Sequence, residues 1–187
     1  LYEKSRSLGG VMAWAGNYRT LRNMEQIAYQ PEWHRTMIAK RGVDVRLGQE
    51  LTAEQILREK PDVVVIATGA APALPEVPGL EAALASGFAR TIDRVLGTAN
   101  DPLPQGPVLV WGAAEGIELA LDLARAGRQV RLLDPAAKFA PAPYIGSRAK
   151  YVNLWAAQAG LAPECGMALL EVTRDCTRVR HPDGREE

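Results

Sequence analysis

Residues 108–134 read VLVWGAAEGIELALDLARAGRQVRLLD. The first four residues are the apolar run of a buried strand, and small residues follow them as a turn. A largely apolar helix comes next and ends at Gly127, after which a second apolar run closes at Asp134. A strand, a glycine turn, a helix and a strand within about 30 residues are typical of a mononucleotide-binding unit.

The residues before this stretch also alternate between strand and helix patterns. They predict a strand end at 1–3, a turn at 7–10, a helix at 31–41 and strands at 43–47 and 63–67. Thr52 and Gln55 predict a capping box for a short helix that runs to Lys60. The chain is therefore predicted to be α/β, with Rossmann-like parallel sheets flanked by helices in two nucleotide-binding units.

Proline content and the glycine turns predict the domain boundaries. We expect a partial FAD- or ADP-binding domain at 1–78, a proline-rich connector at 79–106 and an NAD(P)-binding-like domain at 107–187. The connector is predicted to hold a short helix at 92–96, and the last domain a helix at 147–158 whose Tyr151, Leu154 and Trp155 have core spacing. The chain opens without methionine, and the first domain lacks its leading strand and helix, so we expect a fragment.

Composition excludes several classes of function. The 187 residues carry 22 Lys and Arg against 22 Asp and Glu, so no excess of positive charge is available to bind nucleic acid or an anionic membrane. The longest uncharged stretch is too short to span a bilayer, and because no basic segment precedes an apolar one we expect no secretory signal. The two cysteines fit a reducing, cytoplasmic compartment and form no redox or metal motif.

Asp134 and the turn before it form the first candidate site. Asp134 ends a strand about 20 residues after Gly112, the spacing expected of a carboxylate that accepts hydrogen bonds from ribose hydroxyls. The turn departs from Gly-x-Gly-x-x-Gly in either register. If Gly116 is the third glycine, Trp111 and Ala113 replace the other two; if Gly112 is the first, Ala114 and Ile117 do.

Gly112, Ala113 and Gly116 are therefore candidates to line a pyrophosphate. Glu115 adds a negative charge that is unfavourable beside this group. A turn that serves only packing is an equally good interpretation of the pattern.

The second candidate site lies in the first unit. Glu3 ends a strand ahead of the Gly9-Gly10 turn and has the position of a ribose carboxylate. Ala67, Thr68 and Gly69 follow the predicted buried strand, where the backbone has room to pass close to a nucleotide. No catalytic constellation and no metal-ligand cluster are found.

Taken in order, these motifs resemble a known family. The motifs are LYEK at 1–4, LGG at 8–10, GVDVRLG at 42–48, KPDVVVIATGA at 60–70 and Pro75-x-x-Pro78-Gly79. They are similar to the nucleotide-binding part of old-yellow-enzyme-like multidomain flavoproteins, the family of 2,4-dienoyl-CoA reductase, trimethylamine dehydrogenase and related N-demethylases. In that family a (β/α)8 barrel with FMN and a [4Fe-4S] cluster precedes two Rossmann-like domains.

The resemblance implies roles for the candidate residues. Glu3 would hold the adenosine ribose of FAD or ADP, Gly9 and Gly10 would line its cleft, and Ala67–Gly69 would pass beside it. Asp134 would face the ribose of NAD(H), because a carboxylate disfavours the 2′-phosphate of NADP(H). FMN, the cluster and the barrel are expected only in a missing N-terminal part, which would be this chain's partner; a homo-oligomer is compatible with the sequence.

Two functions follow from these roles. The first is the FAD/NAD(P)-binding portion of an NADH:flavin oxidoreductase, inactive as an isolated fragment. The second is an ADP-holding or structural module without turnover. A disulfide reductase of the glutathione-reductase type is disfavoured, because the sequence has no Cys-x4-Cys after a glycine fingerprint.

Overall fold

The chain folds into two compact units. The computed structural model describes residues 1–21, 25–97, 103–139 and 147–187. The first unit comprises Leu1–Asn17 and Arg22–Pro72, and the second comprises Tyr18–Leu21 and Ala73–Glu187. The expected FAD (or ADP) domain at 1–78, connector at 79–106 and NAD(P)-like domain at 107–187 stay predictions.

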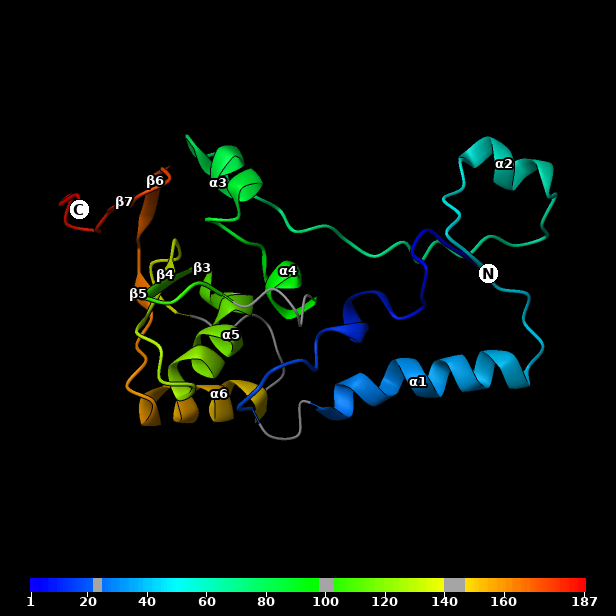
Figure 1. Ribbon diagram of the computed structural model, residues 1–187, viewed down its shortest axis with the longest axis horizontal. Helices are drawn as coiled ribbons and strands as arrows, with labels where there is room; N and C mark the ends of the chain where they lie inside the picture. The colour runs from blue at the N-terminus through cyan, green and yellow to red at the C-terminus, as the bar shows by residue number, and fades with distance from the viewer. Residues whose placement is uncertain (22–24, 98–102, 140–146) are drawn as a thin grey trace. The chain divides into compact units, whose positions relative to one another are not determined.

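Short elements make up the first unit. In chain order they are β1 (Tyr2–Glu3), the 3-10 helix η1 (Gly10–Ala13), α1 (Glu25–Lys40), β2 (Arg46–Leu47) and α2 (Ala53–Arg58) (Figure 1). The strands β1 and β2 are parallel, with Glu3 opposite Leu47. The predicted capping box is confirmed, since the Thr52 side chain accepts a hydrogen bond from the Gln55 backbone and the Gln55 side chain accepts one from the Thr52 backbone.

Two predictions for the first unit are wrong. Helix α1 begins at Glu25 and contains Pro31, instead of beginning there. The run at 63–67 forms no strand: Val63, Val65 and Ile66 are 78%, 84% and 81% exposed. Among the described residues β1 and β2 pair only with each other, so this run has no sheet to join.

Helices and a parallel sheet make up the second unit. In chain order its elements are α3 (Leu80–Ser86), α4 (Ile92–Gly97), β3 (Val108–Trp111), α5 (Ala113–Arg125), β4 (Val130–Asp134), α6 (Ser147–Gln158), β5 (Glu164–Cys165), β6 (Ala168–Val172) and β7 (Thr177–Arg180). The strands β3, β4 and β5 form a parallel sheet in that order, and β6 pairs antiparallel with β7. The predicted strand–turn–helix–strand at 108–134 is confirmed.

The sheet of the second unit is covered on both faces. Leu132 of β4 lies beside the Gly116 position of α5, whereas its neighbour Leu133 packs with Met167 and Val179. Because successive strand residues point to opposite faces, α5 covers one face and the β6–β7 hairpin the other. Leu132 and Leu133 are both fully buried, so β4 lies at the centre of the core.

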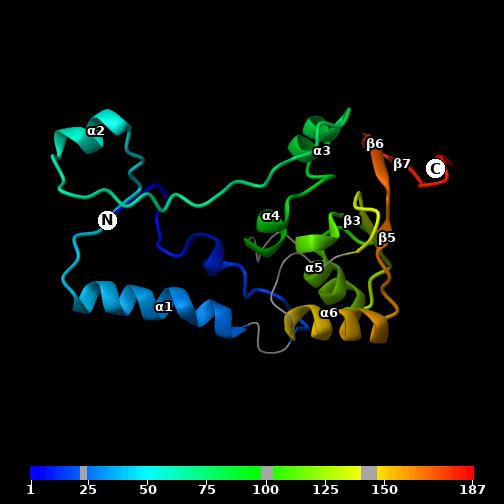
Figure 2. The same cartoon turned by 180° about the vertical axis from the view of Figure 1, so that it is seen from behind.

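Helix α6 packs on α5, as Figure 2 shows from behind. Its buried face holds Val152 and Ala156, while Tyr151 and Leu154 are half-exposed. Of the three residues predicted to face the core, only Trp155 is partly buried, so the prediction is wrong for Tyr151 and Leu154. Helix α3 lies inside the predicted connector and contacts β6, where the Val172 backbone donates a hydrogen bond to the Pro78 carbonyl at 3.0 Å.

Candidate functional site

The turn between β3 and α5 is the centre of the second unit's candidate site. Gly112 is the N-cap of α5 and has φ 90°, a conformation that favours glycine. Its backbone N–H donates to the Leu133 carbonyl at 2.8 Å, which holds the turn to β4. Ala113 is the first helical residue and is fully buried.

Gly116 decides between the two registers of the turn. A Cβ at this position would lie 2.7 Å from Val110 Cγ1 and 3.8 Å from Leu132 Cδ1. This close approach of helix to strand is the role of the third glycine of a dinucleotide fingerprint. Gly116 is therefore the third glycine, and Trp111 and Ala113 occupy the first and second positions.

Asp134 reaches back to this turn from the end of β4. Its carboxylate is 7% exposed. Oδ2 accepts the Ala113 backbone N–H at 2.6 Å, and Oδ1 accepts the Ala136 backbone N–H at 2.7 Å. Both oxygens are thus engaged by the protein's own backbone. The expected ribose role of Asp134 stays a prediction.

The geometry of this turn does not fit a bound dinucleotide as it stands. In a fingerprint, the second glycine lets the backbone approach the pyrophosphate at the helix N-terminus. Here that position is the buried Ala113, whose N–H already donates to a carboxylate. Gly112, Ala113, Gly116 and Asp134 are brought together as predicted, but they form a closed turn.

Glu3 marks the candidate site of the first unit. Its Oε1 accepts the Ser5 backbone N–H at 2.7 Å. This hydrogen bond stabilises the carboxylate and lowers the pKa of Glu3 below its ordinary value. The side chain is half-buried at the end of β1, so Glu3 keeps acceptor capacity as a fixed anion beside the following turn.

Gly9 and Gly10 lie in this turn, close to α1. A Cβ on Gly9 would meet the Cβ atoms of Ala13 and Pro31 at 3.1 and 3.2 Å. The guanidinium of Arg35, on α1, donates to the Leu8 carbonyl at 2.7 Å. The glycine turn is thus packed against α1 and tied to it by Arg35.

Arg6 and Arg35 are site residues that sequence reasoning missed. They line a hollow of about 400 Å³ together with Ser7, Leu8, Ile38, Ala39, Val43, Val45 and Leu47. Arg6 lies close in sequence to Glu3, whereas the Arg35 guanidinium also donates to the Leu8 carbonyl and pairs with Glu32 at 3.1 Å. Two guanidinium groups that line a mostly apolar hollow suit an anionic ligand with a flat apolar part. The sequence could have identified Arg6 as a site residue, because it lies three positions after Glu3. Arg35 could not be found in this way, because helix α1 brings it to the site from a distant part of the sequence.

Ala67, Thr68 and Gly69 are described but lie outside any helix or strand. All three are exposed, and Gly69 has φ 74°. The strand that was expected to present them does not form. Their predicted place beside a nucleotide stays a prediction.

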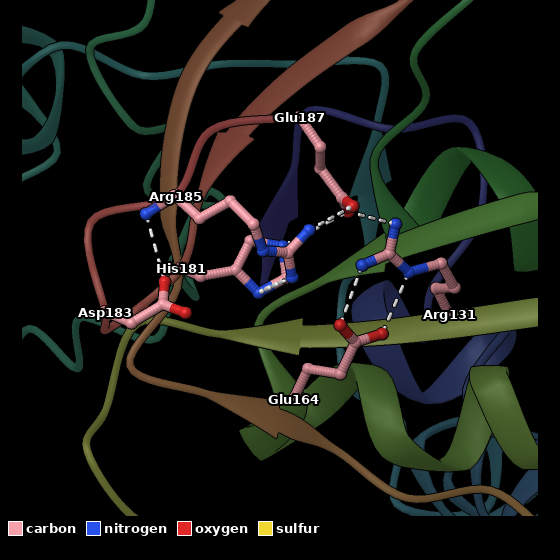
Figure 3. A network of polar contacts seen from close by, with 6 residues as sticks. All are labelled: Arg131, Glu164, His181, Asp183, Arg185 and Glu187. Atoms are coloured by element: carbon pink, nitrogen blue, oxygen red, sulfur yellow. Dashed lines mark hydrogen bonds and ion pairs between the residues drawn. The ribbon is translucent and has the colours of Figure 1, made fainter.

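A polar network in the second unit joins strands β4 and β5 to residues 181–187 (Figure 3). Arg131 of β4 donates to both carboxylate oxygens of Glu164 of β5, at 2.8 and 2.7 Å, and pairs with Glu187 at 2.6 Å. These contacts raise the pKa of Arg131 and lower the pKa values of both carboxyls. His181 Nε2 lies 3.4 Å from Glu187. The network links the edge strand β5 to β4 and to Glu187, and we assign it a structural role.

Asp122 forms a second buried contact that the sequence did not reveal. This α5 carboxylate is 4% exposed. It accepts the Thr20 backbone N–H and hydroxyl at 2.6 and 2.7 Å and the Arg19 backbone N–H at 3.1 Å. The segment Tyr18–Leu21 is held on α5 in this way.

Among the described residues, no group of three or more His, Cys, Asp or Glu is arranged to hold a metal ion. Cys165 and Cys176 are free thiols. No helix in the described part of the chain is long and apolar enough to cross a membrane.

Comparison with known families matches this fold. The model of the family described as pyridine nucleotide-disulphide oxidoreductase matches residues 11–185. The chain belongs to this family. It is therefore an FAD/NAD(P)-binding module of the Rossmann type from the flavoprotein oxidoreductases.

Individual family members match at moderate identity. The chain is 30% identical over 134 residues to an NADH oxidase of Thermoanaerobacter brockii, covering 72% of this chain and 20% of that protein. It is 31% identical over 135 residues to a bilirubin reductase of Mediterraneibacter gnavus, with the same two shares. The chain thus spans about one-fifth of the length of these relatives.

Solved structures share the fold across the whole chain. A 2-naphthoyl-CoA reductase complex matches with a TM-score of 0.79 at 22% identity, covering 100% of this chain and 27% of the other. Histamine dehydrogenase from Rhizobium sp. 4-9 matches with a TM-score of 0.62 at 17% identity, covering 100% and 28%. The predicted fold class and the predicted family resemblance are both confirmed.

Proposed function

We propose that the chain is the nucleotide-binding portion of a multidomain NADH:flavin oxidoreductase of the dienoyl-CoA reductase or amine dehydrogenase and N-demethylase type. In this proposal the first unit holds the adenine nucleotide of FAD, or ADP in its place. The observation that carries it is the half-buried Glu3 residue at a strand end, followed by a packed glycine turn and a hollow lined in part by Arg6 and Arg35.

Each group has a distinct task in this binding. Glu3 accepts hydrogen bonds from the ribose hydroxyls, and Arg6 and Arg35 offset the charge of the phosphates. Gly9 and Gly10 let the backbone pass close to the nucleotide, and the exposed Ala67–Gly69 segment completes the contact. Bound FAD supplies two-electron flavin chemistry, while the residues of this chain bind and orient it.

The remaining parts of the reaction belong to other segments. An FMN barrel with a [4Fe-4S] cluster is the partner that would receive reducing equivalents from the flavin. NAD(H) is the proposed electron donor, in keeping with the name of the related NADH oxidase.

A second candidate is a module that holds ADP without turnover. It is favoured by the closed turn of the second unit, where Asp134 already occupies the Ala113 N–H. In this case the second unit contributes a scaffold and accepts no electrons from NADH.

Nucleotide content of the full-length protein tests the proposal. Nucleotides released by denaturation are identified by chromatography, and NADH is added anaerobically while the flavin absorbance is followed. We expect bound FAD and its bleaching by NADH; ADP with no bleaching would favour the second candidate. Glu3→Gln should lower nucleotide occupancy by roughly 10-fold, as expected for loss of a charged acceptor.

The matched control is Glu50→Gln, an exposed carboxyl of the same unit. It should leave occupancy unchanged. A native protein without adenine nucleotide, or equal occupancy in Glu3→Gln and native protein, would contradict binding by the first unit.

A further inference from the structure

The N-terminus of α5 already carries an anion. The Asp134 carboxylate accepts the first N–H of this helix at 2.6 Å, and Asp134 as a residue is only 7% exposed. A helix N-terminus attracts negative charge because its first N–H groups have no partner within the helix. Asp134 therefore occupies the place where a pyrophosphate would gain most from this helix.

Asp134 is held in this position from two sides. Ala136 donates its backbone N–H to the other carboxylate oxygen at 2.7 Å, and the Met167 backbone donates to the Asp134 carbonyl at 3.0 Å. The residue follows Leu133, which is fully buried in the core. The carboxylate is thus oriented by the strand end and the loop after it.

The second glycine position strengthens this closure. Because Gly116 has the position of the third glycine, Ala113 has the position of the second. In a dinucleotide fingerprint the second glycine leaves room for the pyrophosphate to approach the backbone. Ala113 has a Cβ, is fully buried and has given its N–H to Asp134. A pyrophosphate at this turn would have to displace the carboxylate or lie beside it, and like charges in a partly buried site repel strongly.

We propose that Asp134 is a resident anion that closes the second unit to dinucleotides, so that NAD(H) binds there only when this carboxylate leaves the Ala113 N–H. The inference rests on the proposed function only in that the second unit keeps a nucleotide-binding fold. Asp134 thereby sets the nucleotide affinity of this unit. The Asp134 carboxylate, which the sequence predicts to bind a ribose, is thus the group that blocks dinucleotide binding at the turn between β3 and α5.

Removal of the charge tests this closure. Asp134→Asn keeps one oxygen that accepts a backbone hydrogen bond but removes the negative charge. In the full-length protein with its flavin site loaded, inorganic pyrophosphate and NAD⁺, which cannot reduce the flavin, are titrated into native protein and variant by calorimetry. We expect both probes to bind Asp134→Asn at least ~10-fold more tightly than native protein.

The control is Glu164→Gln, a carboxyl-to-amide change on the adjacent strand β5, where the side chain pairs with Arg131 and not with the Ala113 N–H. It should leave both affinities at the native value. The proposal would be overturned if Asp134→Asn and native protein bound pyrophosphate equally tightly, or if neither protein bound it. Weaker binding by the variant would overturn it too, because the carboxylate would then be holding the ribose.

A measurement on native protein covers the case in which the variant does not fold. With alanine amides labelled for NMR, the Ala113 amide of the free protein should exchange slowly with solvent, and its resonance should shift when saturating NAD⁺ displaces Asp134. Fast exchange of Ala113 in the free protein would overturn the closure. Bleaching of the flavin by NADH reports separately on the proposed function, so failure of one does not imply failure of the other.

Discussion

Gly116 shows how one hydrogen atom in place of a methyl group sets the distance between a helix and a strand. Val110 Cγ1 occupies the space that a Cβ at this position would need, at 2.7 Å. The constraint is steric, because no left-handed conformation is required at Gly116. It acts in the most buried part of the second unit.

Gly116→Ala is therefore expected to destabilise the protein by about 1–3 kcal/mol, the cost of overpacking a core. The free energy of unfolding from denaturant titration measures the change. Val110→Ala removes the opposing methyl groups, so the double variant should lose less than the sum of the two single variants. Strict additivity would show that the two side chains do not meet.

Asp122 illustrates a buried carboxylate with a structural task. Its oxygens accept hydrogen bonds from Thr20 and Arg19, so its removal leaves partly buried donors without acceptors. Asp122→Ala should reduce the free energy of unfolding by about 1–3 kcal/mol. Thr20→Val removes only the hydroxyl donor and should cost less; equal stability of native protein and Asp122→Ala would show that the contact does not form.

At the scale of elements, strands β4 and β5 are joined by more than their short ladder. The pair of β4 Arg131 and β5 Glu164 makes two parallel hydrogen bonds across them. The arginine holds the pKa of Glu164 below its ordinary value of 4.5. A carboxyl with a lowered pKa in the folded state stabilises the fold above that ordinary value, and this contribution disappears as the pH falls below it.

Glu164→Gln should therefore flatten the acid side of the stability profile. Native protein is expected to lose stability between neutral pH and pH values below 4.5, and the variant should lose less over the same range. The effect is modest and shrinks in high salt, because both side chains are partly exposed. Denaturant midpoints across this range measure it, and parallel profiles for the two proteins would refute it.

At the scale of the whole molecule, the two units differ in how much apolar surface they bury. The second unit has a core of fully buried leucine and valine side chains at Leu121, Leu132, Leu133 and Val179. In the described part of the first unit, long apolar side chains such as Val65 and Ile66 are exposed. Stability follows buried apolar area, so it is concentrated in the second unit.

Hydrogen exchange on residues 1–187 should reveal this difference. Amides of α5 and β4 are expected to exchange slowest, and those at 63–67 at nearly the rate of an unfolded peptide. Val65→Lys should reduce binding of an apolar dye without changing the free energy of unfolding. Slow exchange at 63–67 would show that this run is paired in solution.

Local sequence patterns were sufficient to predict those helices, strands and turns that are determined by residues close together in the sequence. The apolar runs at 108–111 and 130–134, the turn between them and the capping box at Thr52 were predictable, because each depends on residues close in sequence. The buried strand at 63–67 was not predicted correctly, since burial requires partner strands that a local pattern cannot supply. The start of α1 was missed because the helix continues through Pro31.

The sequence by itself determined the fold class, the family resemblance and the residues that gather at each turn. Only the tertiary structure decided what those residues do. It assigned Gly116 to helix packing, brought Arg35 to the Gly9 turn, and directed both Asp134 oxygens to backbone N–H groups. The physical reason is that a carboxylate's role depends on the donors around it, and these come from parts of the chain that only folding brings together.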